Sequence, residues 1–292
     1  MTTVLVTGAT GNVGSAAVRE LGRRGTAVRA FVRDRAKAAA ILGEDVALAV
    51  GDLEDPASIR RALDGVDAVF LACGNVPGQV RCETRAIDAA AAAGVGRIVK
   101  LSAHGAQVGS PLAFWDWQGR IEQHLAQSGV PAAVLLPTSY MTNLLASAEA
   151  IAQTGKLFAA AAGARVAMID PRDVAAVAAA ALTEAGHDGR TYVLTGPEAL
   201  TYDEIATALS AVGERTVEFV HVPDEVMREG VLQGGTPEFI ADFLVGLFGA
   251  LRAGAHAVPT DTVRAITGRR PHTIAEFARD HAVAFGGTAI TA

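Results

Sequence analysis

The sequence predicts an α/β protein: a Rossmann-type, doubly wound parallel sheet with a smaller, mostly helical C-terminal substrate domain. Short β-branched runs alternate with alanine-rich stretches up to about residue 137, which is typical of βαβ units. A glycine-rich turn follows the first run, and after Tyr140 the pattern becomes mainly helical. We expect a Rossmann dinucleotide-binding core over residues 1–140 and a C-terminal lid over residues 141–292. Strands of the second part can return to the core, and we expect a cleft between the two.

Six runs in the first half are predicted strands, mostly apolar throughout, as strands covered on both faces must be. They are residues 3–7, 27–32, 46–50, 68–72, 97–101 and 132–136. Helical stretches at 12–24, 56–63 and 79–93 lie between them. The right-handed crossover rule then leaves a Rossmann order as the expected topology. Later strand-like pieces at 165–169, 191–194 and 216–222 stand isolated among helices.

The second half contains two helices with clear signals. Thr201 precedes an amphipathic segment and Glu204 follows three positions later, which predicts a capping box at a helix start. Over residues 239–251, Phe and Leu side chains repeat at helical spacing. This stripe belongs either to the core of the lid or to a homodimer face, and we expect the lid core.

The composition excludes several classes of protein. Half of the 292 residues are hydrophobic and 19% are charged, which supports a large core and excludes a disordered chain. The formal net charge of -6 offers no overall attraction to nucleic acid or to an acidic membrane. We find no membrane-spanning run, no secretory leader before the first strand and too few cysteines for a disulfide framework. A cytoplasmic protein is expected, and the spacing of His and Cys predicts no metal site.

A glycine-rich segment, residues 7–14, lies between the first predicted strand and the first predicted helix. There Gly8 suits a tight turn, Gly11 lets the backbone approach a pyrophosphate, and Gly14 lets the helix lie close to the sheet. The helix N-terminus adds N–H groups and a partial positive charge. The segment therefore predicts a dinucleotide site. Its predicted cofactor-binding residues are Gly8, Thr10, Gly11, Asn12, Val13 and Gly14.

Cofactor choice depends on the end of the second strand, where a carboxylate would hold the ribose 2′-hydroxyl of NAD. Arg33 occupies that place, and Asp34 comes one residue later beside Arg35. A guanidinium pairs well with a 2′-phosphate and stacks on adenine, so NADP(H) is the expected cofactor and NAD(H) the second choice. The alternative reading of this segment is a solvated basic turn.

Further cofactor contacts are expected after the third, fourth and sixth strands. Asp52 offers a carboxylate to the adenine amine, and the turn after the fourth strand passes beside the adenosine ribose and the phosphates. In that turn Cys73 is alternatively a small buried residue. The full set assigned to the cofactor after these strands is Asp52, Leu53, Ala72, Cys73, Gly74 and Pro137.

Several segments together carry a family resemblance. They are residues 6–14, 28–34, 51–53, 127–131 and 136–143, with 169–175 and 192–197 further on. On these segments the chain resembles the NmrA-like branch of the atypical short-chain dehydrogenase/reductases. The resemblance implies a Rossmann domain, a small C-terminal domain and bound NADP(H). It also implies one of two activities: reduction of quinones, dyes or related conjugated compounds, or redox sensing by a regulator that binds the cofactor without turnover.

The larger superfamily uses a Tyr and a Lys four residues apart on the helix after the fifth strand, where the Tyr donates a proton. The positions that resemble this pair hold Phe114 and Gln118, which cannot act as general acids. This departure disfavours an ordinary alcohol dehydrogenase. It leaves open hydride transfer to a quinone, whose product oxyanion is stabilised by conjugation and can be protonated by water.

Four polar residues are candidate catalytic groups in place of that pair. Lys100, Ser102 and His104 lie at or after the end of the fifth strand, and Tyr140 follows the sixth. Open α/β sheets bind ligands beyond the carboxyl ends of their strands, which places all four near the expected nicotinamide. The structural alternatives are a lysine that points away from the site, a serine that caps the strand end, a solvated loop histidine and a tyrosine that forms an aromatic wall.

An aromatic patch supplies candidate substrate-binding residues: Phe114, Trp115 and Trp117, with Asn143 after the sixth strand. The alternative for the patch is packing between a loop and the lid. The expected function is an NADPH-dependent reductase of a quinone or another conjugated aromatic small molecule. The alternatives are a non-catalytic NADP(H)-sensing regulator that binds a protein partner, and an isomerase or coupling enzyme on aromatic polyketides. Direct DNA binding is disfavoured by the net acidity.

Overall fold

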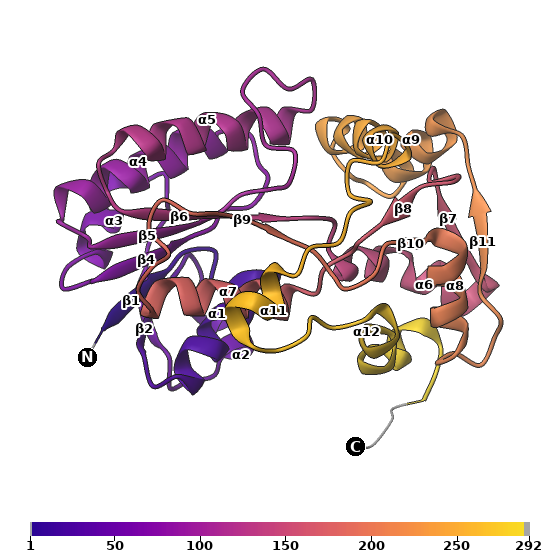
Figure 1. Cartoon of the computed structure of the whole chain (residues 1–292), viewed down its shortest axis with the longest axis horizontal. Helices are drawn as coiled ribbons and strands as arrows, with labels where there is room; N and C mark the ends of the chain where they lie inside the picture. The colour runs from indigo at the N-terminus through magenta and orange to yellow at the C-terminus, as the bar shows by residue number, and fades with distance from the viewer. Residues whose placement is uncertain (1, 289–292) are drawn as a thin grey trace. The chain divides into compact units, whose positions relative to one another are not determined.

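The computed structural model describes residues 2–288, which fall into two compact units (Figure 1). The first unit takes the chain up to Pro137 together with Pro171–Leu194 and Thr262–Arg269. The second unit takes Thr138–Asp170, Thr195–Asp261 and the chain from Arg270 onward. The chain therefore leaves the first unit after the sixth strand and returns to it twice.

The first unit is built on a parallel sheet of seven strands in the order β3-β2-β1-β4-β5-β6-β9. The strands are β1 (Thr3–Val6), β2 (Ala27–Val32), β3 (Ala47–Val50), β4 (Ala68–Leu71), β5 (Arg97–Leu101), β6 (Ala132–Pro137) and β9 (Thr191–Leu194). The order of the first six is that of a Rossmann sheet, with its switch point between β1 and β4. The predicted doubly wound fold class is confirmed.

The seventh strand comes from the second half of the sequence, where strands can return to the core. Residues 191–194 form β9, which pairs in parallel with β6, from Val134 opposite Thr191 to Pro137 opposite Leu194. The local pattern indicates an extended segment and contains nothing about its hydrogen-bond partner, which lies far away along the chain. The sheet consequently gains one strand from the second half of the sequence.

Helices cover both faces of this sheet (Figure 1). On one face lie α1 (Asn12–Arg23), α2 (Arg35–Leu42), α7 (Pro171–Thr183) and α11 (Thr262–Thr267); on the other lie α3 (Pro56–Ala62), α4 (Gln79–Ala92) and α5 (Ala113–Gln127). Helix α7 is buried on almost all sides because its alanines let α1 and the sheet approach closely. No helix between residues 2 and 288 is long and apolar enough to cross a membrane.

The second unit contains two small sheets and several helices. Strand β8 (Arg165–Val166) pairs antiparallel with β10 (Leu200–Thr201), and β7 (Lys156–Ala159) pairs in parallel with β11 (Glu218–His221). The helices are α6 (Ala148–Thr154), α8 (Tyr202–Ser210), α9 (Asp224–Gln233), α10 (Glu238–Arg252) and α12 (Ile274–Asp280), with short 3-10 helices at Met141–Ser147 and Ala282–Phe285. The mostly helical character expected after Tyr140 is confirmed.

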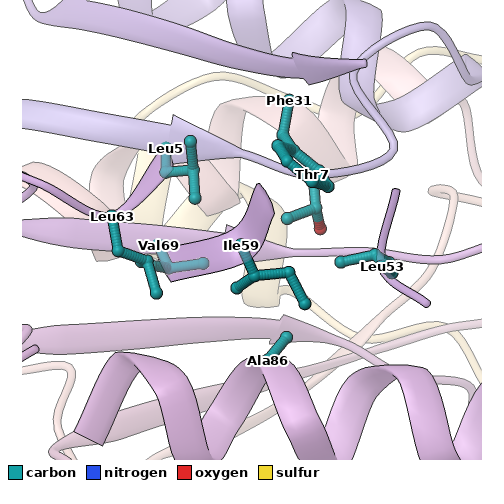
Figure 2. Close-up of a pocket in the computed structure, with 8 residues that line it drawn as sticks. All are labelled: Leu5, Thr7, Phe31, Leu53, Ile59, Leu63, Val69 and Ala86. Carbon is teal, nitrogen blue, oxygen red and sulfur yellow. The ribbon is translucent and has the colours of Figure 1, made fainter. Parts of the chain in front are cut away.

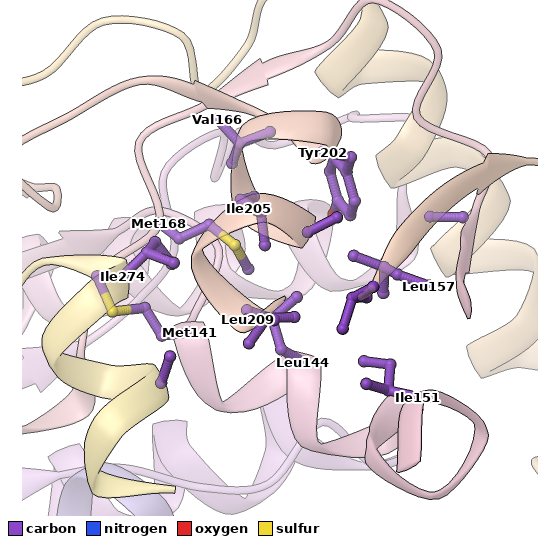
Figure 3. Packing of buried hydrophobic residues seen from close by; sticks show 14 of the residues in the cluster. Met141, Leu144, Ile151, Leu157, Val166, Met168, Tyr202, Ile205, Leu209 and Ile274 are labelled. Carbon is purple, nitrogen blue, oxygen red and sulfur yellow. The ribbon is translucent and has the colours of Figure 1, made fainter. Parts of the chain in front are cut away.

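The core of the second unit forms around α8 (Figure 3). The predicted capping box starts this helix: Thr201 Oγ1 accepts from the N–H of Glu204 at 3.2 Å, and Glu204 Oε2 accepts from the N–H of Thr201 at 2.7 Å. From the stripe at 239–251, Leu251 is buried in this core, and Leu247 and Phe248 pack against it. The remaining Phe and Leu residues of the stripe are only partly buried, so lid-core packing explains its C-terminal end.

A buried carboxylate on α1 gives a stability prediction for the first unit. Glu20 pairs with Arg269 at 2.7 Å, Arg23 at 2.5 Å and Arg24 at 3.6 Å. Burial alone would raise the pKa of Glu20, but the hydrogen bond and charge of Arg269, with the two other arginines, outweigh it and lower the pKa.

Glu20→Gln is expected to lower the free energy of unfolding by about 1 kcal/mol near neutral pH. Because the folded state holds the carboxylate below its ordinary pKa, this contribution is complete above the unfolded value and disappears as the pH falls through the folded one. Urea unfolding of both proteins at about pH 7 and about pH 3 measures the difference. A deficit that is equally large in acid would contradict the assignment.

Candidate functional site

The glycine loop joins the carboxyl end of β1 to α1, at the switch point of the sheet. Gly8 has a φ of 58°, and a Cβ there would meet the carbonyl oxygen of Ala72 at 2.9 Å. A Cβ on Gly14 would lie 2.1 Å from the carbonyl oxygen of Gly8. A Cβ on Gly11 would meet only Gly8 O, at 3.2 Å, and is otherwise in open space. Two glycines thus allow close packing, and the third leaves the backbone open to a ligand.

Helix α1 begins directly after Gly11, which supplies no side-chain cap. Val13 and Gly14 pack inward, whereas Asn12 is exposed and Thr10 is partly exposed. The first N–H groups of a helix have no intrahelical partner and carry a partial positive charge, which suits a phosphate. The loop therefore fits the pyrophosphate of a dinucleotide on its own geometry.

Thr7, which the sequence analysis did not single out, ties this loop to the turn after β4. Its Oγ1 donates to the carbonyl oxygen of Ala72 at 2.8 Å and accepts from the N–H of Ala72 at 2.8 Å. The bonds hold together the ends of β1 and β4, the neighbouring strands at the switch point. Ala72, Cys73 and Gly74 are thereby placed beside the glycine loop. The only sequence signal was a threonine before Gly8, and its partner strand cannot be read from that.

The end of β2 separates two residues that were both candidates for cofactor choice. Asp34 caps α2: its Oδ1 accepts from the N–H of Lys37 at 3.0 Å. Arg33 is exposed and forms no hydrogen bond or ion pair in the part of the chain that the structure describes. The carboxylate is used locally, and the guanidinium remains available to a ligand.

The turns after β3 and β4 hold the other expected cofactor residues. Asp52 Oδ1 accepts from the N–H of Glu54 at 2.9 Å, which shapes its own turn and leaves the second carboxylate oxygen for another donor. Burial, with the nearby Glu83 and Cys82, raises the pKa of Cys73 to about 12. The Cys73 thiol therefore stays protonated at neutral pH and is a poor nucleophile.

A narrow apolar pocket lies behind these turns (Figure 2). Its lining residues are Leu5, Thr7, Phe31, Leu53, Ile59, Leu63, Val69 and Ala86. The volume is about 10 Å³, room for one water molecule at most. This pocket is a gap in the packing of the first unit and is too small for a substrate.

Lys100 of β5 lies in a fully buried polar cluster with side chains of α4 and α5. Its Nζ is 2.9 Å from Oε2 of Glu83, donates to Oε1 of Gln118 at 2.7 Å, and donates to the carbonyl oxygen of Leu101. Gln79 Nε2 donates to Glu83 Oε1 at 2.8 Å. Both charged side chains are 0% exposed. With its hydrogens facing three protein oxygens, Lys100 can influence a reaction through its charge and is poorly placed to give a substrate a proton.

The other candidate catalytic groups lie in different surroundings. Ser102 is buried at the end of β5, and its hydroxyl donates to Oε1 of Glu122 on α5. His104 is partly buried, and its N–H donates to the carbonyl oxygen of Pro137 at 2.9 Å. Burial lowers the pKa of His104 and raises the pKa of Tyr140. Neither shift favours proton donation at neutral pH. Tyr140 and Asn143 belong to the second unit.

The aromatic patch divides into a buried and a partly exposed part. Phe114 is 4% exposed and packs on Trp117 with ring centroids 5.1 Å apart. Trp115 lies against Gly105, where a Cβ would meet the indole at 2.5 Å. Trp115 and Trp117 are partly exposed, so they offer aromatic surface and Phe114 mainly supports them.

Within residues 2–288 no three His, Cys, Asp or Glu side chains gather as a metal site.

Among the predicted site residues, those after β1, β2, β3, β4, β5 and β6 follow the carboxyl ends of parallel strands in one sheet. Those that belong to the first unit therefore lie along one edge of its sheet, whereas Tyr140 and Asn143 belong to the second unit. Glu83, Gln79 and Glu122 are not among the site residues that the sequence predicts. A glutamate one turn after Gln118 was the only signal for Glu122.

A Rossmann-ordered sheet with a glycine loop at its switch point defines a dinucleotide-fold α/β protein. The chain belongs to the NmrA-like family, whose model matches residues 1–267. The resemblance stated from the sequence segments is confirmed.

Three relatives illustrate what this chain is similar to. NAD(P)H azoreductase of Xenophilus azovorans is 40% identical over 283 residues, 97% of this chain and 99% of the azoreductase. The (4-alkanoyl-5-oxo-2,5-dihydrofuran-3-yl)methyl phosphate reductase of Streptomyces griseus is 39% identical over 283 residues, with the same two coverages. The crystal structure of an NADPH-dependent quinone oxidoreductase from Escherichia coli, complexed with NADPH, has a TM-score of 0.85 and 30% identity, covering 94% of this chain and 98% of that one.

Proposed function

We propose that this protein is an NADPH-dependent reductase of a quinone or another conjugated aromatic small molecule. The main observation in favour of NADPH is at the end of β2, where Arg33 stays available to a ligand while Asp34 caps a helix. The relatives described above are named as reductases or oxidoreductases, and two of the names include NADPH or NAD(P)H. Their named acceptors, azo compounds and quinones among them, support a conjugated acceptor here.

The residues of the first unit have distinct parts in this proposal. The glycine loop and the α1 N-terminus hold the pyrophosphate, and Arg33 pairs with the 2′-phosphate. The nicotinamide, when bound, supplies a hydride. Phe114 and Gln118 occupy the positions that resemble the superfamily's Tyr and Lys, and α5 contains neither residue type. A conjugated acceptor suits this arrangement because conjugation spreads the negative charge that the hydride brings.

Arg33→Ala is expected to weaken NADPH binding about 10- to 150-fold, since a charge-assisted pair contributes roughly 1.5 to 3 kcal/mol. NADH lacks the 2′-phosphate, so its affinity should change little. Calorimetric titration of both cofactors measures the two effects. Arg35→Ala, an exposed change in the same turn, is the matched control and should leave both affinities unchanged. Equal losses for the two cofactors would mean that Arg33 contacts adenine only.

The activity itself is tested by NADPH oxidation with a panel of quinones, azo dyes and other conjugated aromatic compounds. The purified protein should oxidise NADPH with at least one of them. Tight NADPH binding without turnover across the panel would contradict the reductase and favour the cofactor-sensing regulator. A pull-down that changes with the ratio of NADPH to NADP+ would then identify its protein partner.

A further inference from the structure

A serine and a glutamate form a hydrogen-bonded pair at the edge of the sheet where ligands bind. Ser102 is the first residue after β5, and its N–H donates to the carbonyl oxygen of Leu135 at 2.9 Å. Its hydroxyl donates to Oε1 of Glu122, on α5. Ser102 is 5% exposed, whereas Glu122 is only partly buried. The serine is therefore fixed at the carboxyl end of the strand, and the carboxyl group behind it keeps some access to water.

Burial, and not the surrounding charge, shifts Glu122 toward its neutral form. The buried cation Lys100 already has a carboxylate partner, Glu83, at 2.9 Å. Burial raises the pKa of Glu122, and the hydrogen bond from Ser102 and the charge of Lys100 offset this only in part. The elements around the pair carry few other titratable groups. His104 lies in the loop after β5, and α5 also carries Asp116, Arg120 and His124. Asp116 pairs with Arg120, His124 pairs with Asp88 of α4, and β6 has no titratable side chain.

We propose that Glu122 and Ser102 form a proton relay that supplies the proton of the reduction, an inference that rests on the proposed reductase. Hydride addition leaves negative charge on an oxygen or nitrogen of the acceptor. When Glu122 is protonated, its carboxyl O–H donates to Ser102 Oγ and the single Ser102 hydrogen turns to the acceptor. The Ser102 O–H proton then moves to that atom while the Glu122 carboxyl proton moves to Ser102 Oγ. NADPH is oxidised to NADP+, the acceptor gains one hydride and one proton, and the Glu122 carboxylate regains a proton from water.

The chemistry of the two groups suits these steps. A serine hydroxyl has one donor hydrogen and two acceptor lone pairs, so it can receive one proton and release another. A general acid works best when its pKa lies near the working pH, and burial raises the pKa of Glu122 above that of an ordinary glutamate. The other candidates fit less well: His104 loses its proton more easily, Tyr140 holds its proton more tightly, and Lys100 is fully engaged.

The test compares turnover against pH for wild type and Glu122→Gln, with quinone and azo acceptors that the wild type reduces. The wild-type kcat should fall as the pH rises through the pKa of Glu122, because only the protonated form gives a proton. Glu122→Gln keeps a hydrogen-bonding partner for Ser102 and carries no acidic proton. We expect its kcat with an azo acceptor to drop about 100-fold and to lose this pH dependence, with NADPH affinity unchanged.

Two further variants separate the relay from a structural role. Ser102→Ala should show the same loss as Glu122→Gln, and Ser102→Thr, which keeps the hydroxyl, should restore most of the rate. Asp88→Asn removes a carboxylate from α4 at its contact with His124 of α5, and serves as the matched control with unchanged kcat. Loss of NADPH affinity equal to the loss of kcat would instead indicate a structural role and overturn the relay.

A measurement without turnover completes the test. Infrared spectra of the wild type should contain a protonated-carboxyl band that titrates above the ordinary glutamate range and is missing in Glu122→Gln. A band that titrates in the ordinary range would overturn the relay. So would full quinone and azo turnover in Glu122→Gln, which leaves the reductase intact. If the wild type fails to oxidise NADPH with every acceptor in the panel, the proposed reductase is overturned, and the relay with it.

Discussion

Gly11→Val is expected to leave the fold intact and to weaken NADPH binding at least about 100-fold, a loss of about 2.7 kcal/mol. A Cβ at this position meets only Gly8 O, at 3.2 Å, so the protein itself can accept a side chain with little adjustment. The branched side chain would instead occupy the space that the proposed pyrophosphate needs beside the helix N-terminus. Calorimetric titration with NADPH measures the loss, and thermal unfolding without cofactor checks the fold.

Gly22→Val is the matched control for this change. Gly22 lies in the same helix, is exposed, and has no heavy atom within 4 Å of an added Cβ. NADPH affinity should therefore stay at the wild-type value. Gly14→Ala provides the opposite comparison, because its Cβ would lie 2.1 Å from Gly8 O and the loop backbone would have to move. Normal NADPH affinity in folded Gly11→Val would refute the placement of the pyrophosphate.

Lys100→Met is expected to lower the free energy of unfolding by about 3 to 5 kcal/mol. The change leaves Glu83 as an uncompensated charge that is 0% exposed, with Gln79 as its remaining hydrogen-bond donor. Breaking a buried pair costs more than exchanging both partners, since the remaining ion has lost the water that would solvate it. Urea unfolding followed by circular dichroism measures the difference.

The double variant Lys100→Met with Glu83→Gln is the control for this prediction. A glutamine at position 83 can accept from Gln79 and carries no charge, so it needs no cation. The double variant should be clearly more stable than Lys100→Met alone, with a coupling energy of about 1 kcal/mol or more. If Lys100→Met unfolds at the wild-type urea concentration, the ion pair contributes little and the cluster is held by its glutamines.

The buried pair also has a consequence for the residues around it. Cys73 and Glu122 both respond electrostatically to Lys100, whose charge lowers the pKa of each. Replacing Lys100 would therefore change the protonation of groups at the ends of β4 and β5 as well as the stability. For this reason Lys100 affects the proposed site through charge although its hydrogens face protein oxygens.

The elements of the first unit could be predicted because their signals are local. Continuous apolar runs indicated β1 to β6 to within one residue at each end, and glycine spacing located the turn at the switch point. The capping box at Thr201 was predicted correctly because both of its partners lie within four residues. The NmrA-like family could also be identified from short segments, since each keeps its own sequence pattern.

The sequence by itself thus determined the strands, the crossover helices and the glycine loop, all of which depend on hydrophobic periodicity and backbone freedom over a few residues. Only the tertiary structure decided which side chains meet: Thr7 with Ala72, Lys100 with Glu83, and Ser102 with Glu122. It also joined β9 to β6. The partners in each of these contacts come from different strands and helices, and their distances depend on how a whole sheet stacks its layers. Short-range pattern carries no record of that packing, so the polar partners at the edge of the sheet appear only when the chain is folded.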